Sequence, residues 1–156
     1  MIRKLLPLIM IVALNILIGS YVLRRNPRRV ANQSFAFFAF SVAAWTLFIA
    51  ITHSVDAAST LSARITFATA SVMVFALFLL FRTFPDEARL RWHWSLSIFG
   101  FAALILSALS FSALIVSDAK LKPDGLEITY GPLHPLYGLY TYSCFAVSIL
   151  LLIKKY

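Results

Sequence analysis

Long apolar stretches separated by short charged segments dominate the pattern of this sequence. Stretches without Asp, Glu, Lys or Arg cover residues 5–23, 30–55, 65–81, 92–117 and 128–153. Each has at least 17 residues, and an α-helix needs roughly 17–25 apolar residues to cross the hydrocarbon core of a bilayer. A transmembrane β-barrel would instead show alternating segments of roughly ten residues. The pattern therefore predicts five transmembrane helices, over residues 5–23, 34–53, 62–82, 95–116 and 133–153.

The composition supports this membrane assignment. Of the 156 residues, 61% are hydrophobic and 13% are charged, whereas soluble domains carry roughly 45–50% apolar and about 25% charged residues. A soluble fold of this size cannot bury so much apolar surface. Residues 1–156 are therefore predicted to form a single all-α integral membrane domain, a bundle of helices. The first stretch lacks a small-residue cleavage site, so we expect a retained helix rather than a signal peptide.

Lys and Arg are distributed unequally between the two sides of the predicted bundle. One side receives nine of them: Arg24, Arg25, Arg28, Arg29, Arg82, Arg89, Arg91, Lys154 and Lys155. The other side receives five: Arg3, Lys4, Arg64, Lys120 and Lys122. The more positive side of a membrane protein usually faces the cytoplasm. The N-terminus is therefore predicted to lie outside, and the C-terminus in the cytoplasm.

Four arginines crowd the loop between the first two predicted helices: Arg24, Arg25, Arg28 and Arg29. In a soluble protein the formal net charge of +8 would suggest a nucleic-acid partner. This loop is short and adjoins the membrane on both sides, so we expect no nucleic acid there. The arginines are interpreted as an orientation signal that also contacts lipid headgroups, at about 1 kcal/mol per near-surface basic residue.

The longest predicted outer loop, residues 116–135, lies between the fourth and fifth helices. Its Pro123-Asp124-Gly125 is typical of a turn, and "LEITY" suits either a short strand or a stretch along the membrane interface. Aromatic side chains gather near this side, as amphipathic rings do at headgroup level. We regard one group of them as a candidate outer sensing region: His53, Tyr130, His134 and Tyr137.

Catalytic chemistry finds no support in the residue pattern. The three histidines and the single cysteine, Cys144, show no metal-ligand spacing. A Gly-rich phosphate loop and a nucleophile elbow are also absent from the sequence. Carboxylates are missing from the predicted helices, which argues against a proton-coupled transporter. We expect no enzyme activity, no cofactor and no metal in this chain.

Polar and small residues inside the predicted helices favour helix packing. Asn15 lies mid-helix, where an amide usually forms an interhelical hydrogen bond, although it can also be functional. Small residues recur at helical spacing in the third helix (Ser62, Thr66, Ala70) and the fourth (Gly100, Ala108, Ser112). Such residues let helices approach closely, so we interpret both sets as packing seams.

Two segments resemble a known family. "NPRRVANQSFAFFAFSVAAWTLFIAITHS" joins a basic loop to Asn32, Phe35 and Trp45, and "YGPLHPLYGLYTYSCFAVSILLLIKKY" places Gly131-Pro132 before a helix. Together they resemble the seven-helix membrane region at the N-terminus of some bacterial sensor histidine kinases. This chain corresponds to about the first five helices, as a fragment or a reduced form. The resemblance implies a sensory bundle in the bacterial inner membrane that passes a conformational change to a cytoplasmic output domain.

Three functions therefore stay open for the chain. The first is this sensory module, with membrane lipid, a second copy or another membrane protein, and an output domain at the C-terminal end as partners. The second is a small accessory or assembly subunit of a larger membrane complex. The third is a piece of a transporter or channel, which the missing intramembrane charge disfavours.

Overall fold

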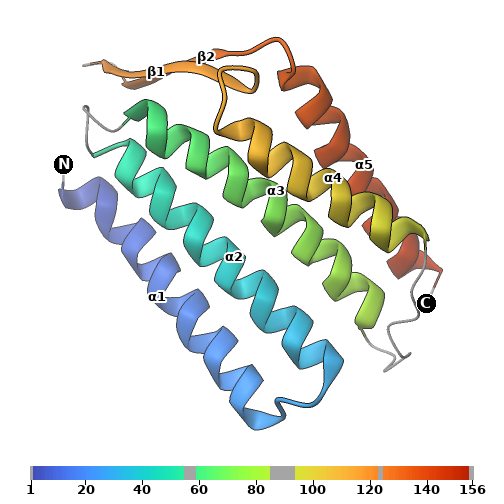
Figure 1. Cartoon of the computed structure of the whole chain (residues 1–156). Helices are drawn as coiled ribbons and strands as arrows, with labels where there is room; N and C mark the ends of the chain where they lie inside the picture. The colour runs from blue at the N-terminus through green and yellow to red at the C-terminus, as the bar shows by residue number, and fades with distance from the viewer. Residues whose placement is uncertain (1, 55–58, 85–93, 123–124, 155–156) are drawn as a thin grey trace.

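Five helices and one β-hairpin make up the structure, a computed structural model that describes residues 2–54, 59–84, 94–122 and 125–154. In chain order the elements are α1 (Ile2–Arg25), α2 (Val30–Thr52), α3 (Ser59–Thr83), α4 (Trp94–Ser110), β1 (Val116–Lys122), β2 (Gly125–Tyr130) and α5 (His134–Ile153). Successive helices run in opposite directions, and the hairpin lies across one end of the bundle (Figure 1). We call this the hairpin end. The opposite end, where α1 gives way to α2, is the arginine end.

The predicted helices agree closely with four of the observed ones. In the described residues, α1, α2, α3 and α5 are each long and apolar enough to cross a membrane. α4 is also apolar but has 17 residues. The predicted helix over 95–116 is wrong at its C-terminal end, because α4 ends at Ser110 and residues 111–115 form turns.

After α4 the chain is hydrogen-bonded to the segment that joins β2 to α5. The backbone N–H of Gly131 donates to the carbonyl of Ile115 at 3.0 Å, and that of Leu133 to the carbonyl of Leu114 at 2.9 Å. A Cβ on Gly131 would lie 2.3 Å from the Leu114 oxygen, so only glycine fits this approach. Ile115 and Val116 are 0% exposed. Protein covers these two apolar side chains. A hydrophobic pattern alone cannot distinguish residues covered by protein from residues covered by lipid.

α3 occupies the centre of the bundle. α2, α4, α5 and β1 all pack against it, while α1 lies at the edge and packs chiefly on α2 (Figure 1). Phe78 of α3 is fully buried, among a core that also includes Leu106 of α4 and Tyr140 and Cys144 of α5. The other elements therefore pack on α3 directly or on a neighbour that does, as α1 packs on α2 and β2 on β1.

Small residues form several of the helix contacts, although the predicted α4 seam is only partly present: Ala108 is exposed, and Ser112 lies beyond the end of α4. A Cβ on Gly100 of α4 would lie 3.2 Å from Phe75 of α3, and one on Gly19 of α1 would lie 2.9 Å from Phe40 of α2. Asn15 instead donates to the carbonyl of Ile11 within its own helix, at 2.9 Å. The expected interhelical hydrogen bond of Asn15 is therefore absent from the contacts of the described residues.

The loop predicted to lie outside folds as an antiparallel hairpin. Its register pairs Val116 with Tyr130 and Lys122 with Gly125, with an irregularity between Val116 and Asp118. "LEITY" therefore belongs to a strand. Gly125 has a φ of +142°, a conformation that other residues rarely adopt. The rest of the predicted turn, residues 123–124, lies outside the described residues.

Candidate functional site at the hairpin end

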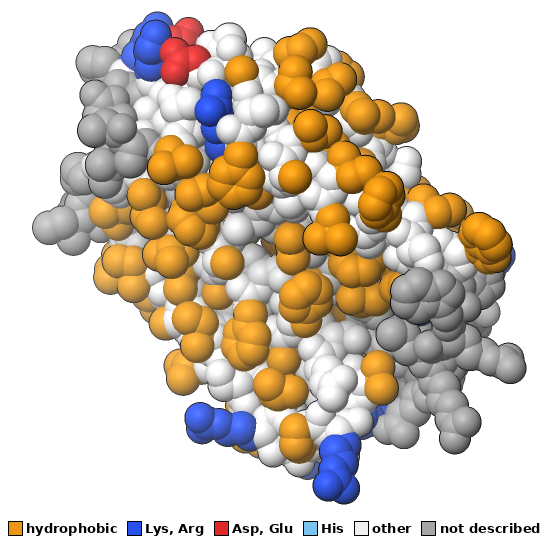
Figure 2. Space-filling model, in the orientation of Figure 1, with side chains coloured by type: hydrophobic (Ala, Val, Ile, Leu, Met, Phe, Trp, Pro, Cys, Tyr) orange, Lys and Arg blue, Asp and Glu red, His pale blue; other side chains and the backbone are white. Residues whose placement is uncertain are grey.

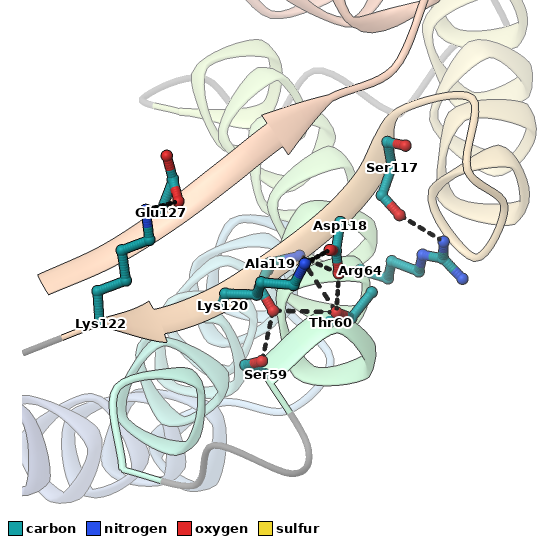
Figure 3. Close-up of polar contacts among 9 residues, drawn as sticks. All are labelled: Ser59, Thr60, Arg64, Ser117, Asp118, Ala119, Lys120, Lys122 and Glu127. Carbon is teal, nitrogen blue, oxygen red and sulfur yellow. Dashed lines mark hydrogen bonds and ion pairs between the residues drawn. The ribbon is translucent and has the colours of Figure 1, made fainter.

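The first turn of α3 holds β1 in place. The Ser59 hydroxyl donates to the carbonyl of Ala119, and Thr60 Oγ1 lies 2.9 Å from Asp118 Oδ1. The Ala119 N–H in turn donates to Thr60 Oγ1 at 3.1 Å (Figure 3). These hydroxyls satisfy β1 backbone groups that would otherwise be costly to bury. The hairpin is therefore fixed to α3 rather than loosely attached.

Arg64, one turn further along α3, fixes the start of β1 and the connection that precedes it. Its guanidinium donates to the carbonyls of Val116 at 3.1 Å, Ser117 at 3.2 Å and Phe111 at 3.3 Å. Charged donors make stronger hydrogen bonds than neutral ones. In the sequence Arg64 counted only as one of five outer positive charges. The structure shows that it organises the backbone on which the hairpin rests.

Two ion pairs lie on the exposed surface of the hairpin (Figure 3). Lys120 Nζ is 2.9 Å from Asp118, and Lys122 Nζ is 2.6 Å from Glu127. The hydrogen bonds from Lys120 and then Thr60 lower the pKa of the Asp118 carboxyl, and Asp118 raises the pKa of Lys120. Exposed pairs contribute little stability, so the buried hydroxyl contacts hold the hairpin more than these pairs do.

Three of the four predicted sensing residues meet around Phe67 of α3. The ring centroid of Phe67 lies 5.2 Å from that of Tyr137, 5.6 Å from that of His134 and 6.3 Å from that of Tyr130, all edge-on. The Tyr130 and His134 rings stack, with centroids 4.0 Å apart. We call Phe67, Tyr130, His134 and Tyr137 the aromatic cluster. The cluster joins the end of β2 and the start of α5 to α3.

His53 lies apart from these ring contacts. It follows the last turn of α2 and lines a cavity of about 160 Å³ together with Thr52, Ile128 and Phe67. Phe67 lines this cavity and also belongs to the aromatic cluster. Sequence reasoning missed Phe67, since nothing distinguishes it from the other phenylalanines of an apolar helix. In the described residues no three His, Cys, Asp or Glu side chains could hold a metal together.

Side chains of α5 bond to the backbone of α3 along the length of their contact. The Tyr137 hydroxyl donates to the Phe67 carbonyl at 3.1 Å, and the Tyr140 hydroxyl to the Ser71 carbonyl at 3.1 Å. Cys144 Sγ lies 3.6 Å from the Val74 carbonyl. The donors advance three or four residues at a time, and so do the acceptors. We call these three contacts the α3–α5 ladder, which begins in the aromatic cluster.

The four arginines of the first loop lie at the opposite end of the bundle. Arg24 and Arg25 end α1, where a positive charge interacts favourably with the helix dipole. Arg28 and Arg29 precede α2, and all four side chains are exposed. Asn32 closes this loop by donating to the carbonyls of Val22 and Asn26, both at 3.1 Å. The amide that contributed to the family resemblance therefore shapes the basic loop.

The fold defines an integral membrane protein, because four of its described helices are long and apolar enough to cross a membrane and large apolar side chains cover its surface (Figure 2). The model of the family described as the N-terminal 7TM region of histidine kinase matches residues 7–156. The chain belongs to this family, as its resemblance indicated, and is a membrane sensor module. Comparisons with curated proteins and with solved structures found no match.

Proposed function

We propose that this chain converts a change at the hairpin end into a displacement of α5 that reaches an output domain at the other end. The observation that carries the proposal is that Tyr137 belongs to both the aromatic cluster and the α3–α5 ladder. A stimulus that rearranges the cluster must therefore act on the first contact of the ladder.

The ladder offers a physical basis for two positions of α5. A helix presents a similar carbonyl every turn, about 5.4 Å along its axis. If α5 shifted by one turn, the Tyr137 hydroxyl would move from the Phe67 carbonyl to the Ser71 carbonyl on the same face of α3. The stimulus shifts this balance only by binding the two packings unequally. The candidate receiver is the aromatic cluster with the neighbouring cavity beside His53.

The proposed orientation has five membrane spans, with the hairpin outside and the arginine end in the cytoplasm of a bacterial inner membrane. In the described part of the chain, both carboxylates, Asp118 and Glu127, belong to the hairpin. The described charges at the arginine end are all positive: Arg24, Arg25, Arg28, Arg29, Arg82 and Lys154. This asymmetry matches the rule that cytoplasmic loops carry the excess of Lys and Arg.

The output side follows from that orientation. α5 ends at Ile153, with Lys154 as its C-cap at the arginine end. A cytoplasmic kinase region attached there would receive the movement of α5 directly. Dimerisation with a second copy would use the exposed apolar faces of the bundle.

The test uses a histidine kinase that carries this membrane region, reconstituted in vesicles, with autophosphorylation as the readout. Removing a ladder hydroxyl by Tyr137→Phe or Tyr140→Phe is expected to change basal autophosphorylation several-fold, because it biases the two packings. Tyr142→Phe is the matched control, since Tyr142 lies on α5 but is 77% exposed. The proposed relay would be overturned if Tyr137→Phe and Tyr140→Phe left basal autophosphorylation at the wild-type level, as Tyr142→Phe is expected to do.

A further inference from the structure

A second site lies at the arginine end, away from the cluster and the ladder. It is a cavity of about 520 Å³ where α1 passes into α2, lined by Tyr21, Val22, Arg25, Asn26, Arg29 and Asn32. The proposed relay uses none of these residues. The lining combines two guanidinium groups with an aromatic ring and an aliphatic side chain, a mixture that suits an amphipathic ligand.

The cavity has a fixed wall. Asn32 donates from one amide nitrogen to the carbonyls of Val22 and Asn26, which ties the start of α2 to the end of α1. The Arg29 N–H donates to the Asn26 carbonyl at 3.3 Å. Binding therefore does not have to order this loop, and a preorganised site binds more tightly than a flexible one.

The charge of the cavity selects an anion. Arg25 and Arg29 both line it, and each carries a positively charged guanidinium group. The N-terminus of α2 adds positive potential of the same sign, because Arg29 provides no side-chain cap. Guanidinium groups pair with phosphate oxygens in a bidentate manner, so a phosphate group is the chemistry that this lining fits.

An apolar track leads into the cavity from the membrane. Met10, Leu14, Leu17 and Tyr21 recur every three or four residues of α1 and are all more than half exposed. Tyr21 belongs both to this track and to the cavity lining. We propose that one anionic phospholipid binds here, with its phosphate between Arg25 and Arg29 and an acyl chain along the track.

Arg24 and Arg28 supply a matched control, because they belong to the same loop but do not line the cavity. The variants Arg25→Gln/Arg29→Gln and Arg24→Gln/Arg28→Gln lose the same charge. All four side chains are exposed, so both variants are expected to fold, and equal circular dichroism verifies this.

The experiment titrates the purified chain in mild detergent with phosphatidylglycerol or phosphatidylcholine and counts bound lipids by native mass spectrometry. The wild type is expected to retain one phosphatidylglycerol in preference to phosphatidylcholine. Arg25→Gln/Arg29→Gln should weaken that binding by at least roughly tenfold, because each substitution removes a charge-assisted hydrogen bond to the phosphate. Arg24→Gln/Arg28→Gln should weaken it by less than about threefold, because these side chains act on the bound phosphate only through screened, longer-range attraction.

Three results would overturn the proposal. Equal losses in the two variants would show a diffuse basic surface without a discrete site. Equal binding of the two lipids would remove the anionic headgroup as the determinant. Displacement of phosphatidylglycerol by inorganic phosphate at the same concentration would show a free-anion site, because the acyl track would then contribute nothing.

Discussion

α1 and α3 are both apolar helices of membrane length, yet the structure uses them in opposite ways. α1 exposes most of its large side chains and packs chiefly on α2, whereas α3 contacts three helices and the hairpin. Asn15 of α1 bonds within its own helix, while the α3 carbonyls of Phe67, Ala68, Ser71 and Val74 accept from α4 and α5. Hydropathy alone does not distinguish the two helices.

The difference shows what specifies a position inside a membrane. Lipid tails are as apolar as leucine, so apolar burial gives little preference between facing lipid and facing protein. α3 is instead positioned by hydroxyls, an arginine and small residues that contact defined backbone groups. α1 is positioned by a close contact at Gly19 and by the loop that Asn32 holds, and the face that does not pack on α2 is available to lipid.

The largest effect is expected from the core of α3. Phe78→Ala removes a ring that is 0% exposed and should lower the free energy of unfolding by about 3 kcal/mol, since the vacated space cannot fill with lipid. Leu17→Ala on α1, where the side chain is 67% exposed, should change it by less than about 0.5 kcal/mol. Unfolding in mixed micelles, followed by circular dichroism, measures both; similar losses would abolish the contrast between the helices.

Arg64 should come next. Arg64→Gln removes charged donors from the carbonyls of Phe111, Val116 and Ser117, at an expected cost of about 2 kcal/mol. Arg24→Gln removes the same charge from the exposed end of α1 and should cost about 0.3 kcal/mol. The same unfolding assay compares them. A loss for Arg24→Gln as large as that for Arg64→Gln would mean that net charge, and not the backbone contacts, is responsible.

The ladder should give a smaller loss. Tyr140→Phe removes one hydrogen bond to the Ser71 carbonyl, and interhelical hydrogen bonds in membranes average about 0.6 kcal/mol. Asn15→Leu on α1 breaks only a contact within its own helix and should leave the unfolding free energy nearly unchanged. A destabilising Asn15→Leu would instead reveal that Asn15 has a partner between helices.

The smallest effect concerns the hairpin contact of α3 with Asp118. Because hydrogen bonds from Lys120 and Thr60 lower the pKa of Asp118 below its usual 3.8, its contribution is complete above that value and is lost as pH falls through the lowered pKa. An NMR titration should move the Ala119 amide resonance with a midpoint below 3.8. Asp118→Asn should remove this transition, and a midpoint above 3.8 would contradict the contact.

Sequence reasoning located α1, α2, α3 and α5 because charged residues bound their apolar stretches. It misplaced the end of α4 because Ile115 and Val116 are as apolar under a hairpin as they would be in lipid. It grouped Tyr130, His134 and Tyr137 through the preference of aromatic rings for the interface. The roles of Phe67 and Arg64 depend on contacts with residues far along the chain, and no local pattern encodes those.

The early end of α4 has a consequence for the surrounding bilayer. Its 17 described residues rise about 25 Å, whereas α1 at the edge of the bundle, with 24 residues, rises about 36 Å, and the hydrocarbon core is about 30 Å thick. Hydrophobic mismatch of this kind costs fractions of a kcal/mol per Å. The lipid beside α4 is therefore expected to thin relative to that beside α1. Acyl-chain length becomes a physical variable to which the two sides of this bundle respond unequally.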